Sequence, residues 1–239
     1  MTITKLLPIG TLLLGLGCNS VDSDGVFTSA LYASIVATAD GDGATRVETT
    51  LYLERPSSLN YIELEGGDVL MAYGPAAESK QMRESQFLGI TSYAATFEAE
   101  DSGSEFIVEL SRIVDDSAPD SRVTLPTAFD VVTADGTTYS RADDDIAIDW
   151  APFDSGDDLD FNVSGSCIEP FGGAVEGDPG TLTILATELV KREAATTADS
   201  CEATVTLSRG RAGTVDPAYG HGGSAFAYQR RVFSFTTAP

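Results

Sequence analysis

The sequence has little of the chemistry that most enzymes and nucleic-acid-binding proteins use. Its 239 residues include one histidine, one tryptophan and three cysteines, and only 14 basic side chains stand against 37 acidic ones. The formal net charge of −23 excludes nucleic acid and anionic lipid as partners of the chain as a whole, because this surface would repel both polyanions. The hydrophobic content of 42% argues against disorder and is enough for a sizeable core in one or two domains.

Residues that could catalyse a reaction are also scarce. General acid/base chemistry near neutral pH mostly uses histidine, and His221 stands alone in the glycine-rich stretch of residues 220–224. No GxSxG motif provides a nucleophilic serine. We therefore expect no enzymatic activity and a solvated His221 on a loop between two strands. A hydrolase that uses two carboxylates is the remaining catalytic alternative.

The N-terminus has the pattern of an export signal. Lys5 precedes an apolar run over residues 6–16, which is shorter than the roughly 20 residues that a helix needs to cross a bilayer. Residues 14–18, Leu-Gly-Leu-Gly-Cys, resemble the lipobox of bacterial lipoproteins. The resemblance implies that residues 1–17 form a cleaved signal peptide and that Cys18 is acylated, which attaches the protein to a membrane. An ordinary secretory signal that contains a cysteine is the alternative.

The residues after Cys18 indicate where such a lipoprotein would reside. In lipoproteins, aspartate directly after the acylated cysteine is the usual signal for retention in the inner membrane, and Asn19 stands there instead. The resemblance therefore implies a cell-envelope location at the outer membrane, on its periplasmic or surface face. Residues 18–25 are otherwise small, polar and acidic, which predicts a lipidated, flexible tether before the first strand.

With Cys18 assigned to lipid, two cysteines remain. Cys167 and Cys201 form an even pair, and an exported protein folds in an oxidising compartment, so we expect a disulfide between them. Such a bridge would close a loop of about 34 residues and stabilise the fold by on the order of 4 kcal/mol. A zinc site is the weaker alternative, because the chain has no CxxC motif and His221 would need a carboxylate to complete four ligands. We therefore expect no cofactor here.

Period-two alternation of apolar and polar residues dominates the rest of the chain. Residues 44–54 and 104–113 each place apolar side chains on one face, and clusters of Gly and Asp separate such segments. The pattern predicts an all-β protein built from antiparallel sandwiches. Residues 75–87 are rich in helix-forming residues but have no apolar stripe, so a polar edge strand and an exposed helical turn are both open.

A strand that ends at Pro126 marks the expected domain boundary, which gives one sandwich over residues 26–126 and a second over 127–239. In residues 146–150, apolar side chains alternate up to Trp150, which resembles the tryptophan-bearing strand of fibronectin type III and immunoglobulin-like domains. The resemblance implies two immunoglobulin-like sandwiches and extends to uncharacterised lipoproteins of Gram-negative bacteria. It implies no activity, because a fold by itself does not determine a function.

Acidic residues gather directly after the tryptophan strand. Asp154, Asp157, Asp158 and Asp160 lie close together in the sequence. Calcium takes about six to eight oxygen ligands, and loops at one end of a sandwich can bring carboxylates together. These four residues are therefore the candidate calcium ligands, and solvated acidic turns are the competing interpretation.

Basic residues gather near the C-terminus. Arg209, Arg211, Arg230 and Arg231 fall on two segments that alternation predicts to be adjacent antiparallel strands. The planar guanidinium suits carboxylates, phosphates and acidic or sulfated sugars, so these residues are the candidate anion-binding site. The competing interpretation is that they neutralise the protein's own aspartates across the sheet. Gln229 and Arg231 interrupt an inward-facing row, which predicts a bulge or a buried polar pair.

Together these features predict a non-catalytic lipoprotein of the cell envelope that acts as a structural or binding module. Its partners would be the membrane, through the N-terminal lipid, and a protein or polysaccharide. A calcium-dependent adhesin or carbohydrate-binding module is the alternative function, with calcium as its cofactor.

Overall fold

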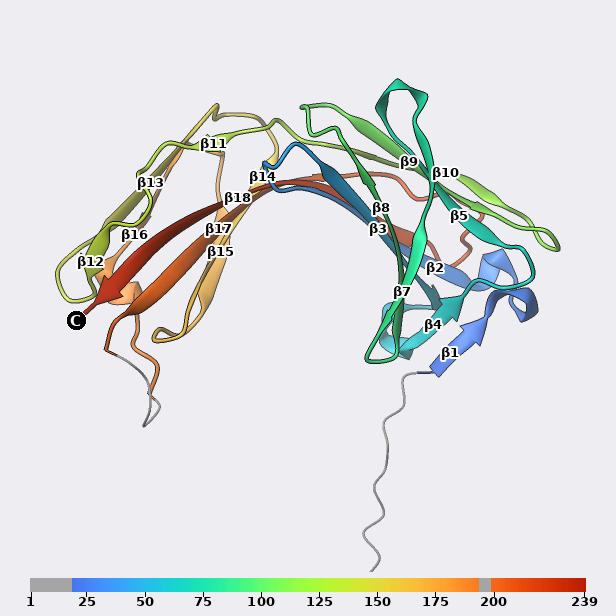
Figure 1. Ribbon diagram of the computed structural model, residues 1–239, viewed down its shortest axis with the longest axis horizontal. Helices are drawn as coiled ribbons and strands as arrows, with labels where there is room; N and C mark the ends of the chain where they lie inside the picture. Colours follow the sequence, from blue (N-terminus) through green and yellow to red (C-terminus); the bar gives the residue numbers. More distant parts are fainter. Residues whose placement is uncertain (1–18, 194–198) are drawn as a thin grey trace, which may run out of the picture.

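The chain forms an arch of two β-sheet lobes (Figure 1). The computed structural model describes residues 19–193 and 199–239. The signal peptide predicted over residues 1–17 and the acylation site predicted at Cys18 lie outside the described residues. Among these residues the helical segments are single 3-10 turns and strands dominate, so the predicted all-β class is confirmed. No described helix is long and apolar enough to span a membrane.

The strands follow one another with short connections. They are β1 (Asn19–Asp22), β2 (Leu31–Ala39), β3 (Thr45–Leu53), β4 (Asn60–Glu63), β5 (Val69–Tyr73), β6 (Ser79–Gln81), β7 (Arg83–Phe87), β8 (Ile90–Phe97), β9 (Glu105–Ser111), β10 (Ala118–Thr124), β11 (Asp130–Val131), β12 (Thr138–Ser140), β13 (Ile146–Ala151), β14 (Asp158–Gly165), β15 (Phe171–Val175), β16 (Thr181–Ile184), β17 (Cys201–Ala212) and β18 (Gly223–Ala238). The 3-10 turns are η1 (Ser23–Gly25), η2 (Thr28–Ala30), η3 (Pro56–Ser58), η4 (Pro75–Ala77) and η5 (Ala186–Glu188). Most of the ambiguous stretch 75–87 is therefore strand, with one short turn at its start.

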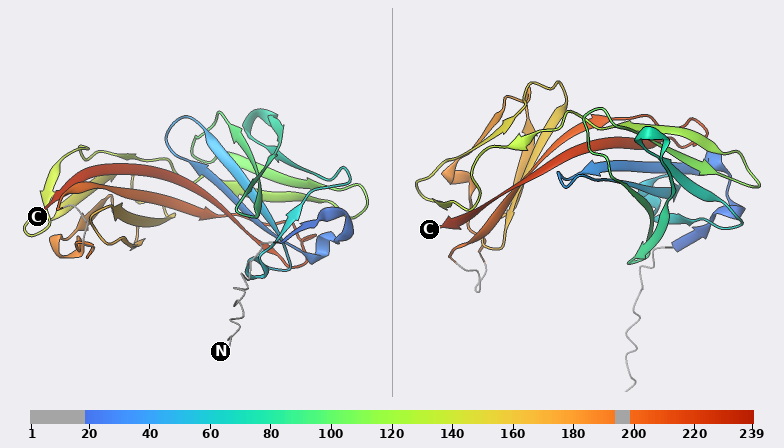
Figure 2. Two further views of the ribbon diagram at one scale, coloured as in Figure 1. Left: turned by 60° about the horizontal axis from the view of Figure 1, so that its bottom comes forward. Right: turned by 45° about the horizontal axis from the view of Figure 1, so that its top comes forward.

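One large sheet runs through both lobes. Its path is β1-β4-β3-β2-β18-β17-β14-β15, with β8 and β7 added beside β3 and β12 added beside β18. Strands β17 and β18 pair in antiparallel register from Cys201↔Thr237 to Ala212↔Phe226, and they curve through the centre of the arch (Figures 1 and 2). These two long strands therefore form the continuous link between the lobes.

The N-terminal lobe, which we define as β1–β10 with residues 213–229, is a sandwich. The four-stranded sheet β10-β9-β5-β6 covers one face of the large sheet. Residues along β2 alternate between buried and half-buried, as the period-two pattern predicts. Side chains from both sheets, such as Ile35 of β2 and Phe106 of β9, form one buried apolar cluster. The hydrophobic effect on this cluster holds the two sheets together.

The C-terminal lobe, which we define as residues 127–212 with 230–239, is built in the same way. The small sheet β11-β13-β16 packs against β14, β17 and β18 around a second apolar cluster. Trp150 of β13 is buried in this cluster, as its inward phase predicts. Cys167 and Cys201 are joined with a Cα–Cα distance of 5.7 Å, which confirms the predicted disulfide.

The boundary expected near residue 126 does not divide the large sheet. The first half of β18 pairs with β2 from Gly223↔Ala33 to Gln229↔Ala39. Ala225 and Ala227 accordingly belong to the apolar cluster of the N-terminal lobe. Residues 213–229 therefore complete the lobe that the sequence assigns to residues 26–126.

Some strand pairs are parallel, where the sequence predicts an antiparallel arrangement throughout. The parallel pairs are β1 with β4, β12 with β18, and β2 with β18. Parallel neighbours need a long connection in place of a hairpin. For β2 and β18 that connection is nearly the whole chain, so no local turn signal in the sequence could reveal the pairing.

The segment predicted as a flexible tether is folded. Strand β1 begins at Asn19 and pairs with β4 from Asn19↔Asn60 to Asp22↔Glu63. Ser23 is buried, and its hydroxyl donates to the Asp68 carboxylate, with Oγ and Oδ2 2.9 Å apart. The prediction of flexibility over residues 18–25 is therefore wrong for its described part. The small polar residues serve here as local hydrogen-bonding groups, a use that composition alone does not distinguish from flexibility.

Candidate binding site

Arg209, a candidate anion-binding residue, is completely buried in the C-terminal lobe. Its guanidinium donates to the backbone oxygens of Thr127 at 2.8 Å and Pro152 at 2.9 Å. It also forms an ion pair with Asp178, with Nη2 and Oδ2 2.8 Å apart and both side chains withdrawn from water. Arg209 therefore serves the interior of the fold and has no access to an external anion.

Asp178 is the acceptor at the centre of this buried network. Trp150 Nε1 donates to its Oδ1 at 2.7 Å, and Ser155 Oγ donates to its Oδ2 at 2.7 Å. Burial by itself raises the pKa of Asp178, but the hydrogen bonds from Ser155, Trp150 and Arg209 together hold it below its ordinary value. The carboxylate is therefore charged at neutral pH and matches the buried guanidinium.

Arg211, two residues further along β17, is engaged by an aspartate. Its Nε and Nη2 donate to the two carboxylate oxygens of Asp157, at 2.7 and 2.9 Å. Its Nη1 also lies 3.3 Å from the backbone oxygen of Leu125 in the other lobe. The bidentate pair lies within the C-terminal lobe, and the contact with Leu125 joins it to the other lobe, so little of the fork remains for a ligand.

Arg231 and Gln229 make the buried polar pair that the broken alternation predicts. Gln229 is fully buried, and its amide donates to the backbone oxygen of Glu100 at 2.7 Å. Arg231 reaches Gln229 Oε1 at 3.3 Å and lies over the ring of Phe129, with its Cζ 5.6 Å from the ring centroid. Arg230 lies 3.5 Å from the Asp40 carboxylate, and its side chain is 41% exposed, close to the 37% of Arg211.

The candidate calcium ligands are not brought together. Asp157 is committed to Arg211, and Asp158 and Asp160 flank the buried Leu159 on the outward face of β14. Within residues 19–193 and 199–239, no group of three or more His, Cys, Asp or Glu side chains is placed to hold a metal ion. Asp154, Asp158 and Asp160 are exposed, in agreement with the interpretation as solvated acidic turns, whereas the side chain of Asp157 is only 7% exposed and pairs with Arg211.

The structure also places His221 and the two cysteines that the sequence considers as zinc ligands. His221 is exposed in the loop between β17 and β18, as expected. The disulfide leaves neither Cys167 nor Cys201 as a thiolate ligand, which removes the zinc alternative.

The inner side of the arch is the uncovered face of the large sheet. Both covering sheets lie on its outer side (Figures 1 and 2). On the inner face, strand register places Arg83 of β7 opposite Ala94 of β8, and Thr96 of β8 opposite Arg46 of β3. Two arginines therefore flank a strand whose own side chains on this face are small.

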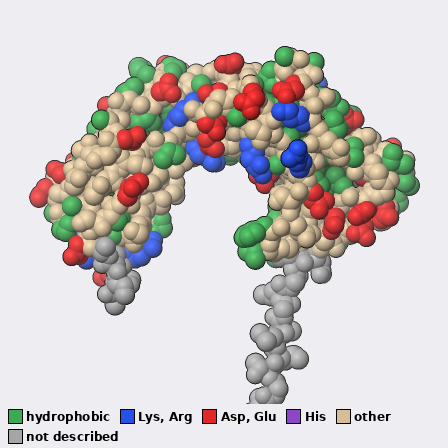
Figure 3. All heavy atoms as spheres, in the orientation of Figure 1, with side chains coloured by type: hydrophobic (Ala, Val, Ile, Leu, Met, Phe, Trp, Pro, Cys, Tyr) green, Lys and Arg blue, Asp and Glu red, His purple; other side chains and the backbone are tan. Residues whose placement is uncertain are grey.

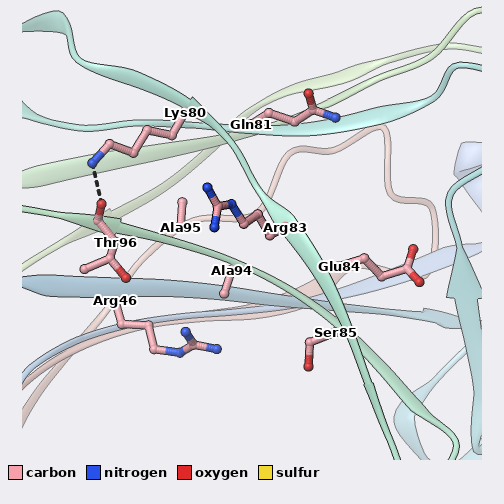
Figure 4. A pocket seen from close by; sticks show the side chains of 9 residues that line it. All are labelled: Arg46, Lys80, Gln81, Arg83, Glu84, Ser85, Ala94, Ala95 and Thr96. Carbon is pink, nitrogen blue, oxygen red and sulfur yellow. Dashed lines mark hydrogen bonds between the residues drawn. The ribbon is translucent and has the colours of Figure 1, made fainter.

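A groove of about 600 Å³ lies along this part of the inner face. Ala94 and Thr96 line its floor, and their small side chains leave space between the long side chains of the neighbouring strands. Arg46 and Arg83 extend toward this space from β3 and β7 of the large sheet, and Lys80 reaches it from β6 at the edge of the covering sheet (Figure 4). Three cations from different strands and one carboxylate, Glu84, thus line the groove, which leaves it an excess of positive charge.

The protein engages the three groove cations to different degrees. Lys80 Nζ donates to the backbone oxygen of Thr96 at 2.5 Å and lies 2.9 Å from the Glu78 carboxylate. Arg46 Nε lies 3.4 Å from Glu48 Oε2, and both side chains are about half exposed, so water weakens the attraction. Across the described part of the chain, no ion pair includes Arg83. Arg83 and, in part, Arg46 are therefore available to an external anion, whereas Lys80 is held by the protein itself.

A second, shallower groove continues the first across β2. Ser34, Val36 and Thr38 line it between Arg46 of β3 and Arg230 of β18. Glu48 and Asp40 also line it, 3.4 Å from Arg46 and 3.5 Å from Arg230. Because neighbouring strands are about 4.8 Å apart, arginines on alternate strands are spaced by on the order of 10 Å. Figure 3 shows Lys and Arg side chains along the underside of the arch, whereas Asp and Glu are prominent over its outer surface and ends.

Comparisons with known proteins identify no family for this chain. The chain matches no protein-family model, and no curated protein matches it. Among solved structures, the chicken CNTN1 FN1–FN3 domains match at a TM-score of 0.25 and 9% identity, over 93% of this chain and 69% of that chain. The two tandem V-type regions of VCBP3, a v-region-containing chitin binding protein, match at 0.23 and 10%, over 88% and 100%. Bacteroides ovatus SGBP-B, from a mixed-linkage glucan utilization locus, matches at 0.22 and 8%, over 97% and 70%.

Similarities at this level carry no functional argument, so the interpretation of the site depends on its own contacts. Arg46, Lys80 and Arg83 are not among the candidate site residues that the sequence predicts. One signal was present: basic residues are scarce, and Arg46 occupies the exposed phase of an alternating strand. The convergence itself depends on the register of three strands, which the sequence does not specify.

Proposed function

We propose that the protein is a non-catalytic binding module of the cell envelope whose inner face binds an anionic polysaccharide. The observation that carries this proposal is the convergence of Arg46, Lys80 and Arg83 on one groove in a chain of net charge −23. Buried arginines are matched closely by carboxylates, as Arg209 is by Asp178. An exposed arginine beside two other cations is instead available to a ligand.

The donors of the groove suit carboxylate or sulfate groups. The guanidinium forks of Arg46 and Arg83 can each donate two parallel hydrogen bonds to such a group, and Lys80 adds a compact positive charge. The acidic remainder of the surface repels the same ligand, which favours binding at the groove over binding elsewhere.

The rest of the inner face favours a polysaccharide over an acidic peptide. Its side chains include hydroxyl groups at Ser34, Thr38 and Thr96, which both donate and accept hydrogen bonds, as sugar hydroxyls do. Phe226 and Tyr228 stack beside the second groove, with ring centroids 6.1 Å apart, and present apolar surface. The grooves are side by side and form a broad surface that suits an extended chain.

We also propose that the module is a lipoprotein, with a signal peptide at residues 1–17 and acyl chains on Cys18. The lipobox-like motif supports this anchoring, and the absence of aspartate at Asn19 supports the outer membrane. The membrane is then one partner and the polysaccharide the other. Mass spectrometry of the mature N-terminus tests this part, since an unmodified Cys18 or an uncleaved signal would contradict it.

Calorimetric titration of the full chain in neutral detergent tests ligand binding. We expect polygalacturonate to bind, with an affinity that falls as salt is added, and neutral dextran to give no heat. The variant Arg46→Gln/Arg83→Gln should lose at least about tenfold in affinity, because each charged hydrogen bond is worth roughly 1.5–3 kcal/mol.

The matched control is Arg55→Gln/Arg192→Gln, which removes two charges outside the groove. It should bind polygalacturonate about as well as the unmodified chain. Equal loss in both double variants, or equal binding of dextran, would show that the groove does not recognise the anion. Preference for polyglutamate over polygalacturonate would assign an acidic peptide as the ligand.

A further inference from the structure

The turn between β7 and β8 exposes an apolar tip. Phe87 is 72% exposed, Leu88 79% and Ile90 41%, and these residues follow one another around Gly89. Isolated apolar residues on a surface are ordinary. A cluster of them at the end of a projecting hairpin indicates a surface that contacts an apolar partner. Figure 3 shows hydrophobic side chains at this lower end of the N-terminal lobe.

The backbone conformation at Leu88 is unfavourable for a leucine side chain. Leu88 and Gly89 both have positive φ, at 50° and 79°, which is the pattern of a two-residue hairpin turn that favours Asn-Gly. A leucine in the left-handed region is uncommon, because its Cβ crowds the backbone. The fold alone therefore gives no reason for an exposed leucine at this position.

The tip lies at the end of the lobe where the described chain begins. Asn19, the first residue of β1, pairs with Asn60 of β4, and the neighbouring Leu59 is itself 54% exposed. Tyr93 of β8 donates its hydroxyl to the backbone oxygen of Ile62 in β4, which packs the hairpin against the same strand. The β7–β8 turn and the start of β1 are on the same side of the lobe (Figures 1 and 2).

Because β1 begins at Asn19, no flexible linker separates this end of the N-terminal lobe from the proposed lipid anchor on Cys18. Asn19 is already paired in β1, so a lipid on Cys18 would begin one residue, or roughly 3.5 Å of chain, away. A bilayer that holds the acyl chains would therefore meet this end of the lobe directly. The side chains it would meet first include the apolar tip.

We propose that the β7–β8 tip, residues 87–90, inserts into the interfacial region of a lipid bilayer beside the anchor. This proposal rests on the acylation of Cys18 proposed above. The net charge of −23 opposes anionic lipid, so the surface it suits is zwitterionic. Acyl chains and the tip together give two attachment points, which fix the orientation of the lobe as well as its location.

Fluorescence quenching in phosphatidylcholine vesicles tests the proposal. The full-length variant Leu88→Trp is reconstituted with lipids that carry bromine on their acyl chains, which quench only tryptophan at membrane depth. The native Trp150 is 2% exposed and supplies a constant background. The matched control is Val132→Trp, at a 64% exposed position of the C-terminal lobe.

We expect the added tryptophan of Leu88→Trp to lose at least half of its emission, and that of Val132→Trp to be unchanged. Equal quenching of the two variants would overturn the proposal. Concentration-dependent dimerisation through the tip without lipid, measured by sedimentation, would assign the tip to a second copy of the chain. Leu88→Asn, which suits the turn, should stay folded and reduce the protection of the hairpin from proteolysis on vesicles.

Mass spectrometry on the same samples distinguishes failure of the insertion proposal from failure of the acylation proposal. An acylated Cys18 with no quenching at position 88 would contradict the insertion proposal alone. An unmodified Cys18 defeats the anchoring proposal, whatever the quenching shows. The titration with polygalacturonate is independent of both, because the groove and the tip share no residue.

Discussion

Arg209 and Asp178 form an ion pair that water does not reach: Nη2 and Oδ2 are 2.8 Å apart, and the side chains are 0% and 1% exposed. Trp150 and Ser155 supply further hydrogen bonds to the same carboxylate. The Arg209 guanidinium in turn donates to the backbone of Thr127, where the chain passes from one lobe to the other. This buried ion pair thus holds the first residues of the C-terminal lobe against β17.

Asp178→Asn should destabilise the protein by about 3–5 kcal/mol, because it leaves the Arg209 guanidinium buried without a counter-charge. For a chain of this size the melting temperature should fall by roughly 10 °C, measured by calorimetry. The control is Asp40→Asn, which removes the exposed partner of Arg230 at 3.5 Å and should cost less than about 1 kcal/mol. Similar melting temperatures for the two variants would contradict the role given to the buried pair.

The same carboxylate should contribute to acid unfolding. The pKa of Asp178 is raised by burial but lowered further by its hydrogen bonds, so the net pKa is below the ordinary value. Its stabilisation is therefore complete above a pH of about 4, the pKa range of an unfolded aspartate, and is lost as pH falls through the lower folded pKa. Urea unfolding across this range should show a shallower acid decline in Asp178→Asn than in Asp40→Asn. Identical acid declines would contradict the assignment.

The disulfide should stabilise the C-terminal lobe strongly. It closes a loop with a sequence separation of 34 residues, and its loss should cost about 4 kcal/mol through the added freedom of the unfolded chain. In Cys167→Ala/Cys201→Ala, the fluorescence of the buried Trp150 should report unfolding at a melting temperature lower by roughly 10 °C. A melting temperature that does not change on mutation or on reduction would count against this contribution.

A fragment that ends at residue 126 should fail to fold alone. It lacks residues 223–229 of β18, which pair with β2, and it lacks Tyr219, which is buried in the same core. Circular dichroism should show a disordered fragment, and addition of a separate chain of residues 127–239 should restore sheet content. A cooperative melting transition in the fragment alone would show that the lobe does not need β18.

The elements that the sequence predicts well are those with a local signal. Alternation in residues 44–54 and 146–150 identifies side chains that the structure buries, and the even pair of cysteines identifies the disulfide. The interrupted row at Gln229 and Arg231 predicts a bulge or a buried polar pair, and the structure contains the polar pair. Each of these depends on neighbours within a strand or on counting residues.

The elements that the sequence does not predict depend on distant pairing. The parallel pairing of β2 with β18 joins residues from the two ends of the chain. It places strands from both expected domains in one continuous sheet. The groove depends on the same kind of register, because Arg46 and Arg83 meet only through β8. Composition was misleading at residues 19–25, where small polar side chains are folded against the lobe.

The most direct test of the central claim compares two single charge removals, Arg83→Gln in the groove and Arg55→Gln outside it. Both residues are exposed arginines, so each variant changes the net charge equally. Titration with polygalacturonate should show about a tenfold loss of affinity for Arg83→Gln and no measurable loss for Arg55→Gln. Equal affinities in the two variants would contradict the assignment of the inner groove as the binding site.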